Sequence, residues 1–167
     1  QLRDLSTMIR AQHPVTKLRP FEMAEVADMG DIGPNPVDVL DTLARFEAAI
    51  AKMRARGIRP LSAGGDHLCT LPILRGLAKG GAPLGLVHFD SHTDLFPAYF
   101  GSKIPTHGNP FRFAVDEGLL DPARMVQIGI RGTTCDNVDT DFAKANGIRV
   151  VRIEELFARA IRDVMAE

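Results

Sequence analysis

The segment 84–89, which reads LGLVHF, constrains the fold more than any other feature of the sequence. It is almost wholly apolar and lacks the alternation of polar and apolar side chains that marks a strand with one solvated face. Continuous runs of this kind are typical of strands in a parallel sheet, because helices cover both faces of such a sheet. The segment therefore predicts a buried strand in an α/β protein.

The rest of the chain alternates between strand and helix patterns. Helices are expected at 36–56, around Leu71 to Leu77, and at 110–117, 139–146 and 153–164, with further strands at 58–63, 125–130 and 148–152. Strands that alternate with helices pair in parallel through right-handed crossovers. We expect a single domain over residues 1–167, of class α/β, with three α-β-α layers around a mostly parallel, doubly wound sheet.

Helix ends are marked by residues with known capping preferences. Asn35 before Pro36, and Asn109 before Pro110, match an N-cap followed by proline at the first helical position. Gly57 is expected to end the first of these helices in the left-handed conformation that glycine adopts without strain.

Composition excludes several classes of partner. The net charge of −1 gives no attraction for nucleic acid or anionic membranes, and no apolar run reaches the ~20 residues of a membrane span. Cys69 and Cys135 have no CxxC spacing, which favours a reducing cytoplasm. The polar start without Met indicates a chain that begins inside a longer gene product.

Polar side chains gather where two expected strands end. Residues 64–67 read GGDH after the strand at 58–63, and residues 90–94 read DSHTD after the strand at 84–89. Ligands bind at the carboxyl ends of strands in such sheets. We expect the paired glycines to allow a sharp turn where a Cβ would clash, and Asp90, His92 and Asp94 to project to one side by strand alternation.

Two carboxylates this close to each other repel when both are ionised, and a bound cation offsets this repulsion. Carboxylate and imidazole ligands without thiolate suit manganese, iron, nickel or zinc, and harder sites favour manganese. The alternative is a strand end at the surface, whose aspartates cap the next helix. The combination of GGDH with DxHxD favours the metal site, with His67, Asp90, His92 and Asp94 as ligands.

Three neighbouring polar residues have other expected roles. His88 is interpreted as a buried, hydrogen-bonded core histidine, and Asp66 as a carboxylate that caps a turn. His107, in the loop from Leu95 to Gly108, is the candidate for a mobile acid or base.

These motifs resemble the ureohydrolases, the family of arginase and agmatinase. The resemblance is strongest to agmatinases and guanidinobutyrases, and it rests on GGDH at 64–67, VHFDSHTD at 87–94, HGNPF at 107–111, VQIGIR at 126–131 and DMGD at 28–31. It extends over nearly the whole chain.

The resemblance implies an arginase-like fold and a site for two Mn²⁺ ions. His67, Asp90 and Asp94 would bind one ion, His92 and Asp90 the other, with Asp90 bridging and catalytic and His107 shuttling protons. The implied reaction hydrolyses a small linear guanidine, such as agmatine or guanidinobutyrate, to urea and an amine. Full-length members of the family are homo-oligomers, as trimers or hexamers.

The chain departs from the family pattern in three places. Leu68 stands where a small polar residue usually follows GGDH, the later SxDxDxxDP motif is absent, and so is the expected first strand. The chain thus resembles about the first half to three-fifths of such an enzyme, truncated at both ends, with a sheet incomplete on its C-terminal side. Alone, it is expected to bind manganese weakly and to show little activity.

Two other functions fit part of the pattern. A metal-dependent deacetylase of related fold also has a DxH ligand pair, although GGDH argues against it. A truncated, non-catalytic module would account for the missing carboxylates. Substrate specificity is expected in the loop with Phe96, Tyr99, Phe100 and Lys103. Lys103 either pairs with the carboxylate of a guanidino acid or, as is usual for lysine, is exposed and solvated.

Overall fold

A computed structural model describes residues 2–99 and 101–166, so that Phe100 of the expected specificity loop lies outside the described residues. The chain divides into two compact units, of which the first ends at Asp31 and the second begins at Ile32. No described helix is long and apolar enough to span a membrane.

Unit 1 contains two short helices, α1 (Leu2–Ser6) and α2 (Pro20–Met23), and neither buries a residue. Its main polar contact is the guanidinium of Arg3, which bonds the carboxylates of Asp28, at 3.1 Å, and Asp31, at 3.1 Å. The Arg3 side chain holds the pKa of Asp28 at about 2, and the backbone N–H of Gly30 acts in the same direction. In this unit ion pairs, and not apolar burial, join segments that are distant in the sequence.

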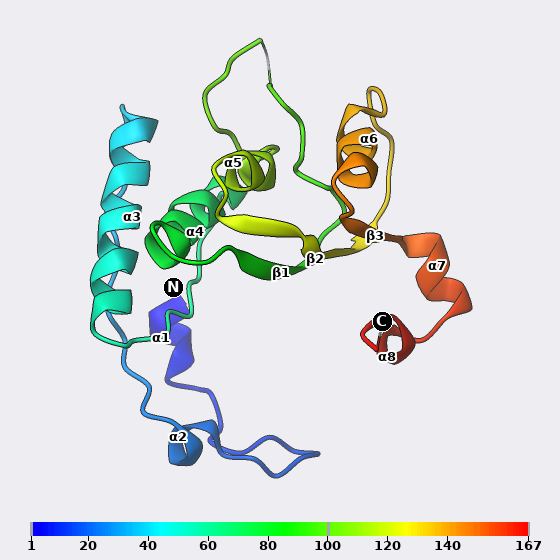
Figure 1. The fold of residues 1–167 in the computed structure, drawn as a ribbon. Coiled ribbons are helices and arrows are strands. Elements are labelled where there is room, and N and C mark those ends of the chain that lie inside the picture. Colours follow the sequence, from blue (N-terminus) through cyan, green and yellow to red (C-terminus); the bar gives the residue numbers. More distant parts are fainter. Residues whose placement is uncertain (1, 100, 167) are drawn as a thin grey trace. The chain divides into compact units, whose positions relative to one another are not determined.

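Unit 2 is built on a parallel three-stranded sheet in the order β1 (Leu84–Phe89), β2 (Leu120–Ile130) and β3 (Arg149–Arg152) (Figure 1). The register places His88 beside Gln127, and Gln127 in turn beside Val150. The predicted α/β class with a parallel sheet is confirmed for this unit.

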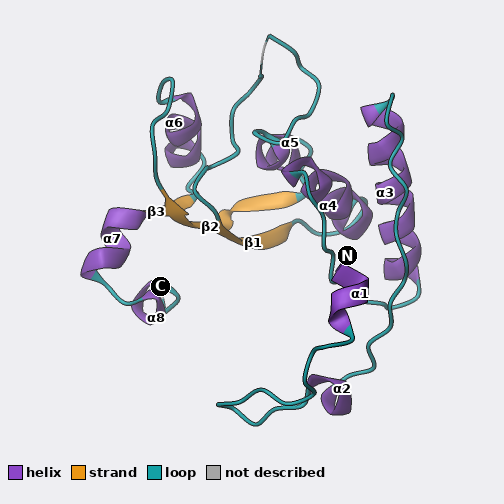
Figure 2. Ribbon diagram, turned by 180° about the vertical axis from the view of Figure 1, so that it is seen from behind, coloured by secondary structure: helices purple, strands orange, loops and turns teal. Residues whose placement is uncertain are grey.

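Helices lie on both faces of the sheet (Figure 2). The described helices of unit 2 are α3 (Val39–Ala55), the 3₁₀ turn η1 (His67–Cys69), α4 (Thr70–Ala78), α5 (Pro110–Asp116), α6 (Val138–Ala145), α7 (Ile153–Ala158) and α8 (Ile161–Val164). Of these, α3 packs against α4. One face is covered by the larger core, which includes Leu43, Leu71, Phe111 and Ala143 from α3 to α6. The other face has only a small cluster in which Val164 of α8 packs against Ile128 and Val151.

The prediction that helices cover both faces of the strand 84–89 was wrong for one face, where only a small cluster of the described residues packs. Val87 and Phe89 are 50% and 63% exposed, because α7 and α8 pack against β2 and β3 and leave the neighbouring surface of β1 open. On the opposite face His88 is buried, and Leu84 and Leu86 are partly buried against the larger core.

The prediction of a strand at 58–63 was wrong, since these residues form no regular structure and Leu61 is 99% exposed. A strand requires a hydrogen-bonded neighbour. Among the described residues β1 pairs on one edge only, with β2, and nothing pairs with 58–63. The expected helix at 153–164 is divided into α7 and α8 by the extended residues Arg159 and Ala160.

The predicted caps were correct in part. Gly57, which was expected to end the first helix, follows α3 with a φ of 72°, and Gly118 follows α5 with a φ of 69°. The cap of α3 is Asp38 and not Asn35, because the Asp38 carboxylate accepts the backbone N–H of Asp41. Asn35 instead donates its side-chain amide to the Asp41 carboxylate, at 2.7 Å.

Gly76 allows the close approach of α4 to α3. A Cβ at this position would lie 2.7 Å from the Cβ of Ile50 and 2.9 Å from the carbonyl of Glu47. We expect Gly76→Ala to lower the free energy of unfolding by about 1–3 kcal/mol, as overpacked cores do, despite the better helix propensity of alanine. Urea denaturation measures the change. Gly33→Ala, where a Cβ meets nothing within 4 Å, is the matched control, and an equal loss in both variants would contradict the packing argument.

Candidate metal centre

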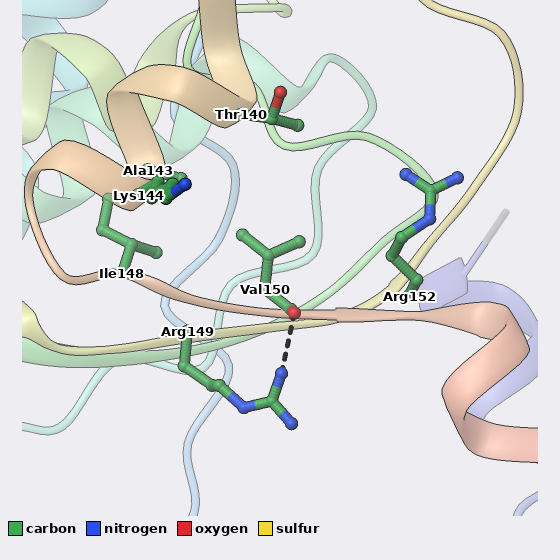
Figure 3. A pocket seen from close by; sticks show the side chains of 7 residues that line it. All are labelled: Thr140, Ala143, Lys144, Ile148, Arg149, Val150 and Arg152. Atoms are coloured by element: carbon green, nitrogen blue, oxygen red, sulfur yellow. Dashed lines mark hydrogen bonds between the residues drawn. The ribbon is translucent and has the colours of Figure 1, made fainter. Parts of the chain in front are cut away.

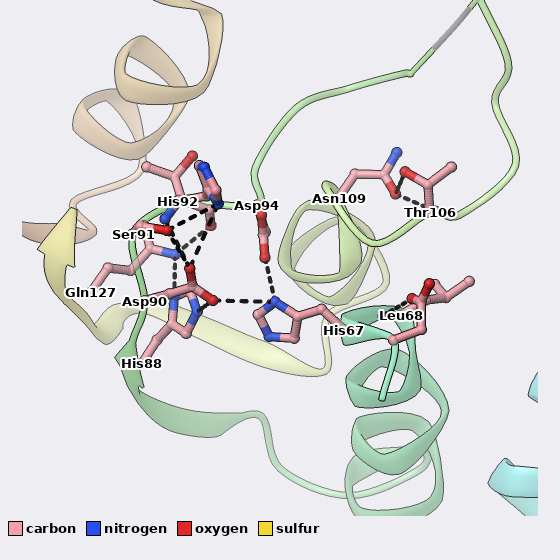
Figure 4. A network of polar contacts seen from close by, with 12 residues as sticks. His67, Leu68, His88, Asp90, Ser91, His92, Asp94, Thr106, Asn109 and Gln127 are labelled. Carbon is pink, nitrogen blue, oxygen red and sulfur yellow. Dashed lines mark hydrogen bonds and ion pairs between the residues drawn. The ribbon is translucent and has the colours of Figure 1, made fainter. Parts of the chain in front are cut away.

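Polar side chains from two segments meet at the carboxyl end of β1 (Figure 4). The Nδ1 atom of His67, in η1, lies 3.4 Å from Oδ2 of Asp90 and 2.6 Å from Oδ2 of Asp94. The predicted convergence of the GGDH and DSHTD segments is therefore confirmed.

The position of His67 follows from the turn in which it lies. Oδ1 of Asp66 accepts the backbone N–H of Leu68 at 2.8 Å, which confirms Asp66 as the capping carboxylate of η1. Leu68 is buried in the larger core and anchors the turn. The steric role expected for Gly64 and Gly65 was wrong: neither has a positive φ, and the nearest contact of an added Cβ would be Cys69 Sγ, 3.7 Å from Gly64.

The DSHTD segment is not the extended strand that was expected. Asp90 Oδ1 accepts the backbone N–H of His92 at 3.0 Å, which turns the chain directly after β1. Asp94 has a φ of 53°, in the left-handed region that costs non-glycine residues free energy and is often found at functional sites. This conformation lets the buried Asp94 carboxylate reach His67. Strand alternation therefore does not explain the arrangement.

The resulting cluster has the composition of a cation site. His67, His88, Asp90 and Asp94 each offer an atom suited to a metal, and these atoms lie within 4.8 Å of one another. The buried Oδ2 of Asp94 faces Nδ1 of His67, and no described lysine or arginine forms an ion pair with Asp90 or Asp94. Two carboxylates that no lysine or arginine neutralises fit a divalent metal.

Burial and neighbouring charges shift the pKa values of His67, His88 and Asp90. The Asp94 carboxylate raises the pKa of His67, while burial lowers the pKa of His88 and keeps that ring neutral. Burial also acts to raise the pKa of Asp90, but the backbone N–H of His92 and the neighbouring imidazoles outweigh it, so this carboxyl stays ionised. Metals bind ionised carboxylates and neutral imidazoles, so the raised pKa of His67 lets a proton compete with a metal at this ring.

The two other predicted site histidines, His92 and His107, are not among the four residues of this cluster. His92 is exposed, and its Nδ1 lies 3.8 Å from Oδ1 of Asp90. His107 is exposed as well, and its ring contacts Tyr99 at a centroid distance of 5.8 Å. Their roles in metal binding and proton transfer stay predictions.

A cavity of about 170 Å³ adjoins the cluster and is lined by His92, Phe96, Tyr99, Arg131 and Asp139, among others. Aromatic residues of the expected specificity loop thus face the DSHTD segment, while Lys103 of the same loop is exposed. A larger cavity, of about 470 Å³, lies between α6 and β3 (Figure 3). Its lining includes Lys144, Arg149 and Arg152 but no histidine or carboxylate, so it does not suit a cation.

The sequence analysis missed one pair of residues at the site. Gln127 and Thr93 are almost completely buried, and Nε2 of Gln127 donates to the carbonyl of Thr93 at 2.6 Å. The same nitrogen lies 3.2 Å from Nδ1 of His88. The signal was present as a single polar residue in the apolar strand VQIGI.

Comparisons with known proteins agree with this geometry. Residues 1–167 match the family described as the arginase family. The chain is 47% identical to a guanidinopropionase from Pseudomonas aeruginosa over 167 residues, which are 100% of this chain and 52% of that protein. It therefore spans about half the length of this relative.

Solved structures show the same fold. Proclavaminate amidino hydrolase from Streptomyces clavuligerus superposes with a TM-score of 0.80 at 34% identity, covering 94% of this chain and 52% of that one. Trypanosoma cruzi formiminoglutamase with Mn²⁺ superposes with a TM-score of 0.85 at 18% identity, covering 99% and 55%, which supports the fold alone.

Proposed function

The chain belongs to the arginase family, and on this premise we propose that it forms part of a binuclear manganese amidinohydrolase, which hydrolyses a linear guanidine to urea and an amine. The observation that carries the proposal is the convergence of His67, Asp90 and Asp94 at the carboxyl end of β1. The name of the guanidinopropionase supports the substrate class, and a cluster of carboxylates and imidazoles without thiolate supports a hard divalent metal such as manganese.

Asp90 has the geometry of a bridging ligand. Its Oδ2 faces His67 at 3.4 Å, and its Oδ1 faces His92 at 3.8 Å. The Asp90 carboxylate would therefore help to hold both cations, together with His67, Asp94 and His92. The exposure of His92 leaves the second position accessible to substrate and to further ligands.

In the proposed mechanism the metal ions and the protein side chains have separate roles. His67, Asp90, His92 and Asp94 would hold the two manganese ions. When bound, these ions would supply a water molecule of lowered pKa that can attack the guanidinium carbon. When the tetrahedral intermediate breaks down, His107 delivers a proton to the nitrogen of the departing amine, which lets urea and the amine separate.

The described chain supplies only part of such a site. The later carboxylate motif of the family is absent from the sequence, and among the described residues the outer edge of β1 has no partner strand. A strand at this edge would end beside Asp90 and could carry the remaining carboxylates. We expect calorimetric titration of residues 1–167 alone with Mn²⁺ to show no pair of tight sites. Two tight sites would contradict this division of ligands.

The activity is tested on the full-length encoded protein loaded with Mn²⁺. We expect urea release from a panel that contains guanidinopropionate, guanidinobutyrate and agmatine, and no acetate release from acetyl-lysine or acetylpolyamines. Acetate release without urea would support the deacetylase. Absence of both products from a metal-loaded protein would support a non-catalytic module.

Lys103 provides a test of substrate class. If this exposed lysine pairs with the carboxylate of a guanidino acid, Lys103→Ala raises KM for guanidino acids about fivefold, as expected for loss of one partly exposed ion pair. KM for agmatine, which has no carboxylate, stays unchanged. Lys144→Ala, an exposed lysine at the other cavity, is the control. Equal effects of Lys103→Ala on both substrates would exclude the pairing.

A further inference from the structure

His88 lies in β1, is 6% exposed, and sits beside Gln127 of β2 in the sheet register. It is one of the four groups with an atom suited to a metal, which leaves two possible roles for its ring. It either binds the cation directly or orients a neighbour that does. The hydrogen bonds around the ring distinguish the two roles.

The amide of Gln127 has a single allowed orientation. A backbone carbonyl only accepts hydrogen bonds, so the group 2.6 Å from the Thr93 oxygen must be the NH₂ of Gln127 and not its oxygen. The second N–H of this NH₂ faces Nδ1 of His88 at 3.2 Å. Because two N–H groups cannot face each other favourably, Nδ1 of His88 must be the acceptor.

The proton of the neutral His88 ring is consequently on Nε2. This atom is buried, has no other hydrogen-bond partner within the described residues, and lies 3.4 Å from Oδ2 of Asp90. An N–H buried without an acceptor costs free energy, and the Asp90 carboxylate is the acceptor within reach. The ring of Phe111, with its centroid 4.4 Å away, packs against the imidazole and restrains its rotation.

We propose that Gln127 and the Thr93 carbonyl lock His88 in the Nε2–H tautomer, so that His88 positions the Asp90 carboxylate and does not bind the metal itself. A protonated nitrogen has no lone pair for a cation. A carboxylate oxygen has two, so Oδ2 of Asp90 can accept from His88 and still face the metal. The inference rests on the proposed metal site, but the tautomer can be measured without metal.

The first experiment is long-range ¹H–¹⁵N NMR on the full-length, metal-free protein with ¹⁵N-labelled histidine. We expect the His88 signal, assigned by its loss in His88→Gln, to show an unprotonated Nδ1 and a protonated Nε2. In Gln127→Glu, whose carboxylate can only accept, the proton should be found on Nδ1. A wild-type ring protonated on Nδ1 would overturn the proposal whether or not the protein is a hydrolase.

The second experiment measures manganese affinity by calorimetry. Glutamine carries an N–H donor near the place of Nε2, so His88→Gln should bind Mn²⁺ within a few-fold of wild type. His88→Leu and Gln127→Glu should lose roughly 10–100-fold, as is usual when a group that orients a ligand is removed. Circular dichroism confirms that each variant is folded. An equal loss in His88→Gln and His88→Leu would overturn the positioning role.

Electron spin echo spectroscopy of the Mn²⁺-loaded protein gives a direct readout of the ligands. The number of histidine nitrogens coupled to manganese should be the same in wild type and in His88→Gln, and a decrease by one would identify His88 as a ligand. Failure of the proposed hydrolase function would appear separately, as absence of urea release from a protein that shows the expected tautomer and affinities.

Discussion

Asp90→Ala should raise the dissociation constant for Mn²⁺ by roughly 100-fold or more and abolish urea release. This loss of affinity is larger than the loss expected when a residue that only orients a ligand is removed. The reason is that Asp90 faces both His67 and His92 and would bind both ions. Calorimetry on the full-length protein measures the affinity. Thermal unfolding gives a second measure, since Mn²⁺ at 100 times its dissociation constant should stabilise wild type by ~2.7 kcal/mol and leave the variant almost unchanged.

Asp116→Ala is the matched control for this prediction. Asp116 is also an aspartate of unit 2, but it is half-exposed at the end of α5 and pairs with Arg112 at 2.9 Å. Its replacement should leave the affinity for Mn²⁺ unchanged. Retention of tight manganese binding by Asp90→Ala would remove the central support of the proposed function.

Phe111→Ala should lower the free energy of unfolding by about 3–5 kcal/mol, the usual cost of truncating a buried phenylalanine. Phe111 is 1% exposed and belongs to the larger core. Its ring also contacts the imidazoles of His67, at 5.4 Å, and His88, at 4.4 Å. The cavity left by alanine would loosen both histidines, so manganese affinity should fall together with stability. Urea denaturation and calorimetry measure the two effects.

Phe157→Ala provides the comparison, because this phenylalanine of α7 is 83% exposed. Its truncation should change stability by no more than about 0.5 kcal/mol, as for other surface substitutions, and should leave manganese affinity unaltered. Similar losses of stability in the two variants would mean that the core described around α5 does not determine the stability of unit 2.

The parallel sheet was predictable because its cause is local. The segments 84–89 and 125–130 are largely apolar and are separated by a helical pattern, and this alternation leaves few topologies. The segment 58–63 was also predicted as a strand but forms none, because a strand depends on a neighbour to which it can bond. The exposure of Val87 and Phe89 has a related origin, since the coverage of a face depends on helices elsewhere in the chain.

The sequence by itself determined which residue types meet at the site. His67 and Asp90 belong to the GGDH and DSHTD segments, which were expected at one edge of the fold, and the spacing of these motifs resembles that of one family. Only the tertiary structure decided how they meet. Asp94 is left-handed and its carboxylate contacts His67 from a distant segment, and Gln127 orients His88 from the neighbouring strand. Periodicity reports which residues share a face of one element, whereas a hydrogen bond between two strands requires both partners to be placed in space.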